Sequence, residues 1–199
     1  MQFTNTPNRE ITTTEGERLH VSRSVAVVAQ VFIFHVASQS WLVLLGERGQ
    51  GVDDFHGQWC FPCGYLDWDE TLYEALIREV WEETGLSLPK LRTHEHTHHW
   101  IDAALDPEGG VAPRKVSAEP SNNRQNVSAS FACWLSWLGE ELPMLSLDNM
   151  EIDEATDARF LPLDEAQKLD LAFNHNQVLK ALLTLDARRF RQIEASVGI

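Results

Sequence analysis

Apolar residues in this chain gather into short continuous runs, a pattern typical of buried β-strands. The clearest run is Val25–Phe34, which reads VAVVAQVFIF and is rich in β-branched residues. A second run, Ser40–Leu45, is followed by the glycine-rich stretch GERGQG at 46–51, which predicts a turn. Further strands are expected in three later segments: Leu91–Ile101, Val127–Leu138 and Ala158–Leu163.

Two segments have the spacing of helices. Between Leu72 and Trp81 the apolar residues recur at intervals of three and four and form one broad arc. Asp67 or Asp69 can cap the start of this helix, and Gly85 suits the left-handed residue that ends one. The second helix is expected near the end of the chain. Asp164 would cap its start, and the helix would run towards Leu183.

Mixed strands with two helices predict the α/β class and a three-layer α/β/α sandwich around a mixed sheet. The 199 residues suffice for one domain, expected over 22–185. Residues 1–21 are polar and are expected to form a separate N-terminal segment, and 186–199 a C-terminal tail. The stretch 102–126 has no periodicity and predicts a long loop insertion, of a kind that tends to be either functional or disordered.

Three carboxylates on the first helix point to chemistry. Glu79, Glu82 and Glu83 are three and four residues apart, so they lie side by side at one edge of the apolar arc. Their charges repel, and Arg78 supplies a single positive charge against three. A hard divalent cation such as Mg²⁺ or Mn²⁺ would resolve the repulsion, whereas the alternative is a solvated acidic face. The fixed offsets of the surrounding glycines, arginine and glutamate favour the metal site.

The segment from Gly64 to Leu86, GYLDWDETLYEALIREVWEETGL, matches every fixed position of the Nudix box and thus resembles the Nudix hydrolase superfamily. This resemblance implies a loop–helix–loop that binds Mg²⁺ or Mn²⁺ and hydrolyses nucleoside diphosphate derivatives. It implies metal ligation by the side chains of three glutamates and by one backbone carbonyl, namely Glu79, Glu82, Glu83 and Gly64. It further implies that Arg78 holds Glu79 in place and that Glu70 braces the loop–helix junction.

The residues just before the box extend the resemblance. Gly57–Gly64 reads GQWCFPCG, similar to the family pattern G-x-W-x-x-P-G-G. Cys63 replaces the first glycine of the final pair, which leaves the loop conformation open. We interpret Cys63 as a small side chain beside a tight turn; a reactive thiol is the alternative, but no cationic residue adjoins it.

A further carboxylate is expected near the metal. Glu154 lies six residues before Phe160, at a position where related proteins often carry an extra metal ligand or the general base. Glu151, Asp153 and Asp157 are in the same loop, and a solvated acidic loop is the alternative. The catalytic base is therefore either Glu79 or Glu154.

Three residues are candidates for substrate contacts. Arg48 follows the second strand, where family members often place such an arginine; a turn-exposed arginine is the alternative. Trp100 could stack on a nucleobase or simply pack in the protein. His175, with Phe173, forms an A-F-x-H pattern that resembles the start of the last helix in ADP-ribose pyrophosphatase-like relatives, although capping and packing would also explain it.

The stretch THEHTHHW places three histidines, His94, His96 and His98, on one face of an expected strand. A zinc or nickel site in this cluster (His94–His99) is one interpretation. A polar sheet face is favoured, because no cysteine joins the histidines.

Composition narrows the classes of partner. A net charge of −14 argues against binding to nucleic acid polymers or anionic membranes and leaves a small molecule as the expected partner. Hydrophobic residues make up 43% of the chain, but no run of eighteen apolar residues predicts a membrane span. The three cysteines form no disulfide framework, and the first residues lack a signal pattern, so a cytoplasmic protein is expected. A homodimer remains open.

The favoured function is metal-dependent hydrolysis of a diphosphate linkage in a nucleotide sugar, an ADP-ribose-like compound or an NTP, releasing a nucleoside monophosphate. The alternative is a non-catalytic Nudix domain that senses a nucleotide. Isomerase chemistry on a prenyl diphosphate is a third hypothesis, disfavoured by the intact pyrophosphatase box.

Overall fold

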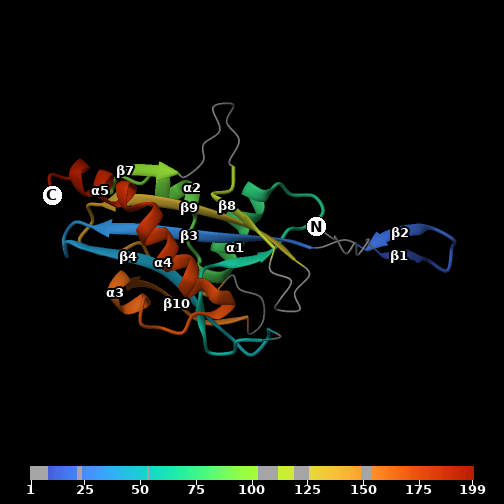
Figure 1. Cartoon of the computed structure of the whole chain (residues 1–199). Coiled ribbons are helices and arrows are strands. Elements are labelled where there is room, and N and C mark those ends of the chain that lie inside the picture. The colour runs from blue at the N-terminus through green and yellow to red at the C-terminus, as the bar shows by residue number, and fades with distance from the viewer. Residues whose placement is uncertain (1–8, 22–23, 53, 103–111, 119–125, 149–153) are drawn as a thin grey trace, which may run out of the picture.

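The structure, a computed structural model, describes residues 9–21, 24–52, 54–102, 112–118, 126–148 and 154–199 (Figure 1). Its strands are β1 (Arg9–Thr12), β2 (Arg18–Val21), β3 (Val25–His35), β4 (Ser40–Arg48), β5 (Trp59–Cys60), β6 (Cys63–Tyr65), β7 (Thr97–Asp102), β8 (Lys115–Ser117), β9 (Val127–Trp137) and β10 (Ala155–Pro162). Its helices are α1 (Leu72–Thr84), α2 (Leu88–Arg92), α3 (Leu163–Ala166), the 3₁₀ turn η2 (Ala172–Asn174), α4 (His175–Leu185) and α5 (Ala187–Ser196).

A mixed sheet of eight strands forms the centre of the described structure, with β10, β4, β3, β9 and β7 as its main path. β3 and β9 run parallel in register from Val25 opposite Val127 to His35 opposite Trp137. The short strands β5 and β6 pair antiparallel with β4 and β3. They bring the loop before α1 to the N-terminal end of β3.

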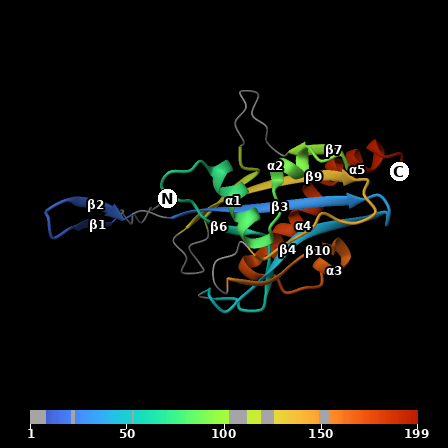
Figure 2. The same cartoon turned by 180° about the vertical axis from the view of Figure 1, so that it is seen from behind.

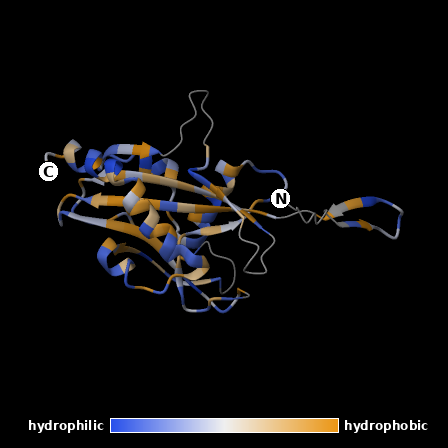
Figure 3. Cartoon of the chain, in the orientation of Figure 1, coloured by the Kyte–Doolittle hydropathy of each residue, from blue (hydrophilic) through white to orange (hydrophobic). Residues whose placement is uncertain are grey.

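Helices cover both faces of the sheet. Because side chains alternate along a strand, Val27 and Val31 of β3 face α1 and α2, whereas Phe32 and Phe34 face α4 and α5. Figure 1 views the sheet from the side of α4 and α5, and Figure 2 shows α1 and α2 on the opposite face. The hydrophobic colouring follows the sheet strands and the turns are mostly hydrophilic (Figure 3). The predicted α/β/α sandwich is confirmed.

The strand predictions were right for the long buried runs and wrong in one segment. Leu91 lies in the short helix α2, and the strand begins only at Thr97. Pro89 stands in the first turn of α2, where its fixed φ favours a helix. The Thr97 hydroxyl donates to the Leu91 carbonyl at 2.6 Å and ties the end of α2 to the start of β7.

The expected long loop at 102–126 also contains secondary structure. Asp102 closes β7, and Lys115–Ser117 form β8, which pairs antiparallel with β9. Residues 103–111 and 119–125 of this insertion lie outside the described residues.

The helix expected over 164–183 is interrupted. α3 ends at Ala166, and Phe173 and Asn174 then adopt left-handed backbone conformations with φ of 58° and 63°. Two consecutive left-handed residues cannot continue a right-handed helix, so α4 starts only at His175.

Residues 186–199 are part of the folded body and not a mere tail. Within α5, Phe190 is buried and its ring lies 4.7 Å from Trp41 and 5.3 Å from Phe32. The helix thereby covers one end of the sheet face that α4 also covers (Figure 1).

Residues 9–21 form a hairpin of β1 and β2, which stands away from the sandwich (Figures 1 and 2). Within the described residues, every helix is too short or too polar to cross a lipid bilayer.

Candidate functional site

α1 begins with a capping box. The Thr71 hydroxyl accepts from the Glu74 backbone N–H, and the Glu74 carboxylate accepts from the Thr71 N–H at 2.8 Å. Thr71 is thus the N-cap, and the expectation of Asp67 or Asp69 was wrong. The T-x-x-E signal for this cap was present in the sequence. The helix ends as expected at Gly85, with φ of 69°.

Arg78 is the centre of a network of carboxylates. Its Nη1 donates to Glu79 at 2.8 Å and to Glu82 at 2.9 Å. Its Nε and Nη2 donate to both oxygens of Glu70 at 3.0 and 2.6 Å, and Nη2 also donates to the Tyr65 carbonyl. These bonds raise the pKa of Arg78 and lower that of Glu70. One guanidinium therefore links the loop to two carboxylates of α1.

Glu70 joins this network to the loop itself. Its carboxylate accepts from the Asp67 backbone N–H at 2.8 Å as well as from Arg78. This geometry agrees with the expected bracing of the loop–helix junction.

Glu79 lies against Gly64. A β-carbon added to Gly64 would fall within 3.0 Å of all three atoms of the Glu79 carboxyl group. Glu79 is only 8% exposed. Burial, opposed by Arg78 and aided by the charges of Glu82 and Glu154, raises its pKa to about 7.

Glu83 points to the same loop from the next turn of α1. Its carboxylate accepts the Cys63 backbone N–H at 3.2 Å. Burial raises its pKa well above the usual value, and the charge of Glu79 adds to the effect. Two carboxylates with raised pKa values therefore face the Cys63–Gly64 turn.

This donor set fits a divalent cation. Carboxylate oxygens are the ligands that Mg²⁺ and Mn²⁺ prefer, and a cation would offset the burial of Glu79 and Glu83. The side chains are not arranged around a common metal position, however: among the described residues, no three His, Cys, Asp or Glu side chains are close enough together to hold an ion. Arg78 occupies the space between Glu79 and Glu82 instead. The convergence expected from helical spacing is thus incomplete.

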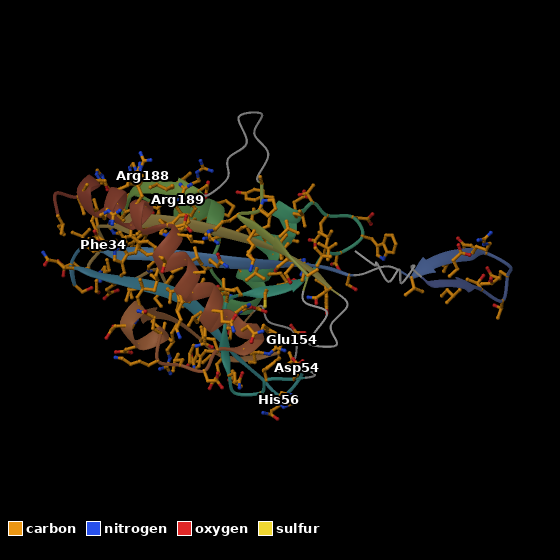
Figure 4. All side chains as sticks on the ribbon, in the orientation of Figure 1. Phe34, Asp54, His56, Glu154, Arg188 and Arg189 are labelled. Atoms are coloured by element: carbon orange, nitrogen blue, oxygen red, sulfur yellow. The ribbon has the colours of Figure 1, made fainter. Side chains whose placement is uncertain are left out.

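Glu154 lies near these carboxylates, at the start of β10. Its charge contributes to the raised pKa of Glu79, and its backbone carbonyl accepts from Gly49 N–H at 2.8 Å. Figure 4 shows it beside the loop that carries Asp54. The neighbouring candidates Glu151 and Asp153 lie outside the described residues.

Arg48 ends β4 and is held by its surroundings. Its Nε donates to the Asp54 carbonyl at 3.0 Å, and Nη2 lies 3.2 Å from the Asp54 carboxylate. Its guanidinium lies 4.5 Å from the centre of the Phe173 ring. Phe55, which also has a positive φ of 57°, meets Phe173 edge-on at 4.9 Å. Asp54 and Phe55 were not predicted at this site, because nothing near them in sequence marks the bond of Asp54 to Arg48 or the contact of Phe55 with the distant Phe173.

Two candidate substrate contacts bond to other parts of the protein: His175 is buried and Trp100 is half-buried. His175 is 5% exposed, and its Nδ1 accepts the Phe61 backbone N–H at 3.1 Å. Trp100 donates from its indole N–H to Asp102 at 2.7 Å and packs against the core beneath α1. These contacts agree with packing, which was the alternative to substrate binding for each of the two residues.

Cys63 lies beside a second thiol. Its contact with Cys60 and its burial raise the pKa of Cys63 well above the ordinary value, although the charge of Arg48 acts in the opposite direction. This favours the interpretation as a small side chain beside a turn.

The histidine cluster contains no metal cage within the described residues. The rings of His94 and His96 lie 4.8 and 5.4 Å from the Trp137 ring, while His98 contacts the Ser196 carbonyl. His94 and His96 line a hollow of about 690 Å³ beside the C-terminal end of α1. A second hollow of about 40 Å³ lies next to Trp100. Neither hollow is lined by the three glutamates.

Comparisons with known proteins concern the family and the fold of the chain. The NUDIX domain family model matches residues 25–182. An RNA pyrophosphohydrolase of Cereibacter sphaeroides is 29% identical over 108 residues, which is 47% of this chain and 66% of the relative, so less than two thirds of its length is covered.

Two solved structures share the fold. The NUDIX domain of Shewanella oneidensis NrtR, complexed with ADP ribose, has a TM-score of 0.53 at 21% identity, covering 80% of this chain and 86% of that one. A bifunctional NMN adenylyltransferase/ADP ribose pyrophosphatase of Francisella tularensis, complexed with AMP and a Mn ion, has a TM-score of 0.55 at 22% identity. The match covers 81% of this chain and 41% of that one. At these identities the likeness concerns the fold alone.

Proposed function

Because this chain belongs to the NUDIX domain family, we propose that it is a divalent-metal-dependent pyrophosphohydrolase of nucleoside diphosphate derivatives. It would cleave a diphosphate linkage in a nucleotide sugar, an ADP-ribose-like compound or an NTP and release a nucleoside monophosphate. The observation that carries the proposal is the pair of carboxylates at the Cys63–Gly64 turn: buried Glu79 lies against Gly64, half-buried Glu83 accepts the Cys63 N–H, and the pKa of each is raised in the absence of a cation.

The ligands in this proposal are the side chains of Glu79, Glu82 and Glu83 and the Gly64 carbonyl. When bound, Mg²⁺ or Mn²⁺ would neutralise the diphosphate and polarise the phosphorus under attack. Arg78 orients Glu79 and Glu82 through its paired hydrogen bonds. Its role is therefore to hold the ligands, and it does not transfer a proton.

Proton transfer needs a carboxylate that accepts a proton near neutral pH. Glu79, with its pKa near 7 before metal binding, is one candidate, and Glu154 beside it is the other. Arg48 would contact the substrate from the other side, since its guanidinium is already oriented by Asp54 and Phe173.

A small anionic substrate is consistent with the net charge of −14, which disfavours a nucleic acid polymer or an anionic membrane. A reducing compartment such as the cytoplasm agrees with Cys60, Cys63 and Cys133 being free thiols. A homodimer remains a proposal.

The test is hydrolysis of a substrate panel in Mg²⁺ or Mn²⁺: ADP-ribose, nucleotide sugars, dinucleoside polyphosphates, (deoxy)NTPs and 5′-triphosphate RNA. We expect turnover of at least one class and its loss in Glu82→Gln, with Glu165→Gln, an exposed carboxylate on α3, as the matched control. Product analysis in ¹⁸O-water would locate the attacked phosphorus. Tight nucleotide binding without turnover would instead favour a sensing domain.

A further inference from the structure

His175 stands at an unusual turn. It follows Phe173 and Asn174, whose φ angles of 58° and 63° are uncommon for residues other than glycine. Such conformations persist only where the surrounding structure holds them, and they cluster at functional sites. The turn directs His175 inward, where it is buried, at the first residue of α4.

The imidazole of His175 acts as a fixed hydrogen-bond acceptor. Its Nδ1 accepts the Phe61 N–H at 3.1 Å, so this nitrogen carries no proton and the ring is neutral. Burial, helped by the charge of Arg48, lowers the pKa of His175 to about 3. The acceptor is therefore retained throughout the physiological pH range.

Phe61 begins the four residues that reach the proposed metal ligands. The Pro62 carbonyl accepts the Ala29 N–H of β3 at 2.8 Å. The Cys63 N–H donates to Glu83, and Gly64 lies against Glu79. His175 thus anchors the start of a loop whose end faces two carboxylates of α1.

The same turn also reaches the candidate substrate arginine. The Phe173 ring lies under Arg48 at 4.5 Å, and its centre is 5.5 Å from that of His175. The Phe61 ring lies 5.0 Å from His175 on the other side. Residues 173–175 therefore join the end of β4 to the loop that precedes the box.

We propose that His175 is a positioning residue, which holds the Phe61–Gly64 loop through its Nδ1 so that the Gly64 carbonyl and the glutamates of α1 can share a divalent cation. This inference rests on the proposed function. It assigns His175 no contact with the substrate and no proton transfer.

The test uses three variants of the full chain. In His175→Asn the side-chain oxygen replaces Nδ1 at the same branch of the side chain and can accept the Phe61 N–H, whereas His175→Phe keeps a ring but has no acceptor. His35→Phe is the matched control, because His35 is also buried and hydrogen-bonded but ends β3 far from the strand pair β3–β6. Mn²⁺ affinity is measured by electron paramagnetic resonance without substrate, alongside hydrogen exchange of the Phe61 amide and thermal unfolding.

We expect His175→Phe to weaken Mn²⁺ binding and to lower kcat by about 10-fold or more, the usual effect of losing a group that orients metal ligands. Exchange at the Phe61 amide should rise in the same variant. His175→Asn should return Mn²⁺ affinity to within about 3-fold of the wild type, and His35→Phe should leave it unchanged.

Wild-type affinity in His175→Phe would overturn the proposal, as would equal losses in His175→Asn and His175→Phe. If His175→Phe does not fold, His175→Asn decides: retained affinity with a protected Phe61 amide supports the role, and lost affinity contradicts it. If the wild type hydrolyses nothing on the panel but the Mn²⁺ pattern holds, the proposed function fails while the positioning role stands.

Discussion

Gly64 and Glu79 are in such close contact that no side chain can stand between them. A β-carbon on Gly64 would overlap the carboxyl group of Glu79. The close approach brings the Gly64 backbone against a buried carboxylate, although the two residues are fifteen positions apart in sequence. Glycine is therefore required here for space, since its φ is not in the left-handed region.

Gly64→Ala should abolish Mn²⁺ binding and hydrolysis, because the new methyl group must push Glu79 out of place. Cys63→Gly, which restores the glycine pair of the family pattern, should retain both activities. The Cys63 thiol meets Cys60 and packs at the edge of the apolar core, and the substitution keeps the backbone N–H that bonds Glu83. Binding and turnover assays on the two variants check this pair. Equal activity in Gly64→Ala and the wild type would contradict the steric argument.

Arg78→Lys should destabilise the metal-free protein by about 1–3 kcal/mol, because one ammonium cannot bridge Glu70, Glu79 and Glu82 as the guanidinium fork does. Saturating Mn²⁺ should reduce the difference in unfolding free energy between Arg78→Lys and the wild type, since the cation compensates part of the negative charge of the glutamates. Urea unfolding with EDTA or with Mn²⁺ measures both effects. Arg92→Lys, in a more exposed pair with Asp102, is the control and should change stability by less than about 0.5 kcal/mol.

Glu79 should make the metal-free protein less stable as pH rises. Its pKa is raised from 4.5 to about 7 on folding, so the folded state holds the proton more tightly between these values. The contribution is complete below pH 4.5 and is lost as pH rises through 7, with a size of about 3 kcal/mol. Unfolding from pH 4.5 to 8 in EDTA should show this decline in the wild type and a smaller one in Glu79→Gln. Identical profiles for the two proteins would contradict the assignment.

Arg48→Ala should raise KM more than it lowers kcat, by about 10-fold or more, if its guanidinium binds the anionic substrate. Trp100→Phe should leave KM within about 2-fold, because Trp100 bonds to Asp102 and packs beneath α1. Steady-state kinetics of both variants, with the substrate found in the panel, measures these changes in KM and kcat. A KM increase in Trp100→Phe alone would restore Trp100 as the substrate contact.

The sequence predicted features encoded by local spacing. The long strands β3 and β9, the apolar arc of α1 and its end at Gly85 all follow from residues close in sequence. The bond from Arg78 to Glu82 is also local, since these two residues lie one helical turn apart. The Thr71 cap was also encoded locally, but two nearby aspartates offered competing caps.

Contacts between distant segments were not predictable in the same way. His175 meets Phe61 across 114 positions, and Phe173 and Asn174 adopt left-handed conformations without a glycine to announce them. The break before α4 and the burial of α5 also depend on tertiary packing. Helical spacing placed the three glutamates side by side, but it could not show that their carboxylates would have separate partners, with Glu79 and Glu82 on Arg78 and Glu83 on the Cys63 N–H.

Mn²⁺ titration of the purified protein, followed by electron paramagnetic resonance, tests the central claim most directly. The wild type should bind Mn²⁺, and Glu83→Gln should weaken that binding by at least about 10-fold, while Glu165→Gln should not. Equal Mn²⁺ affinity in the wild type and Glu83→Gln would contradict the assignment of these glutamates as the metal site.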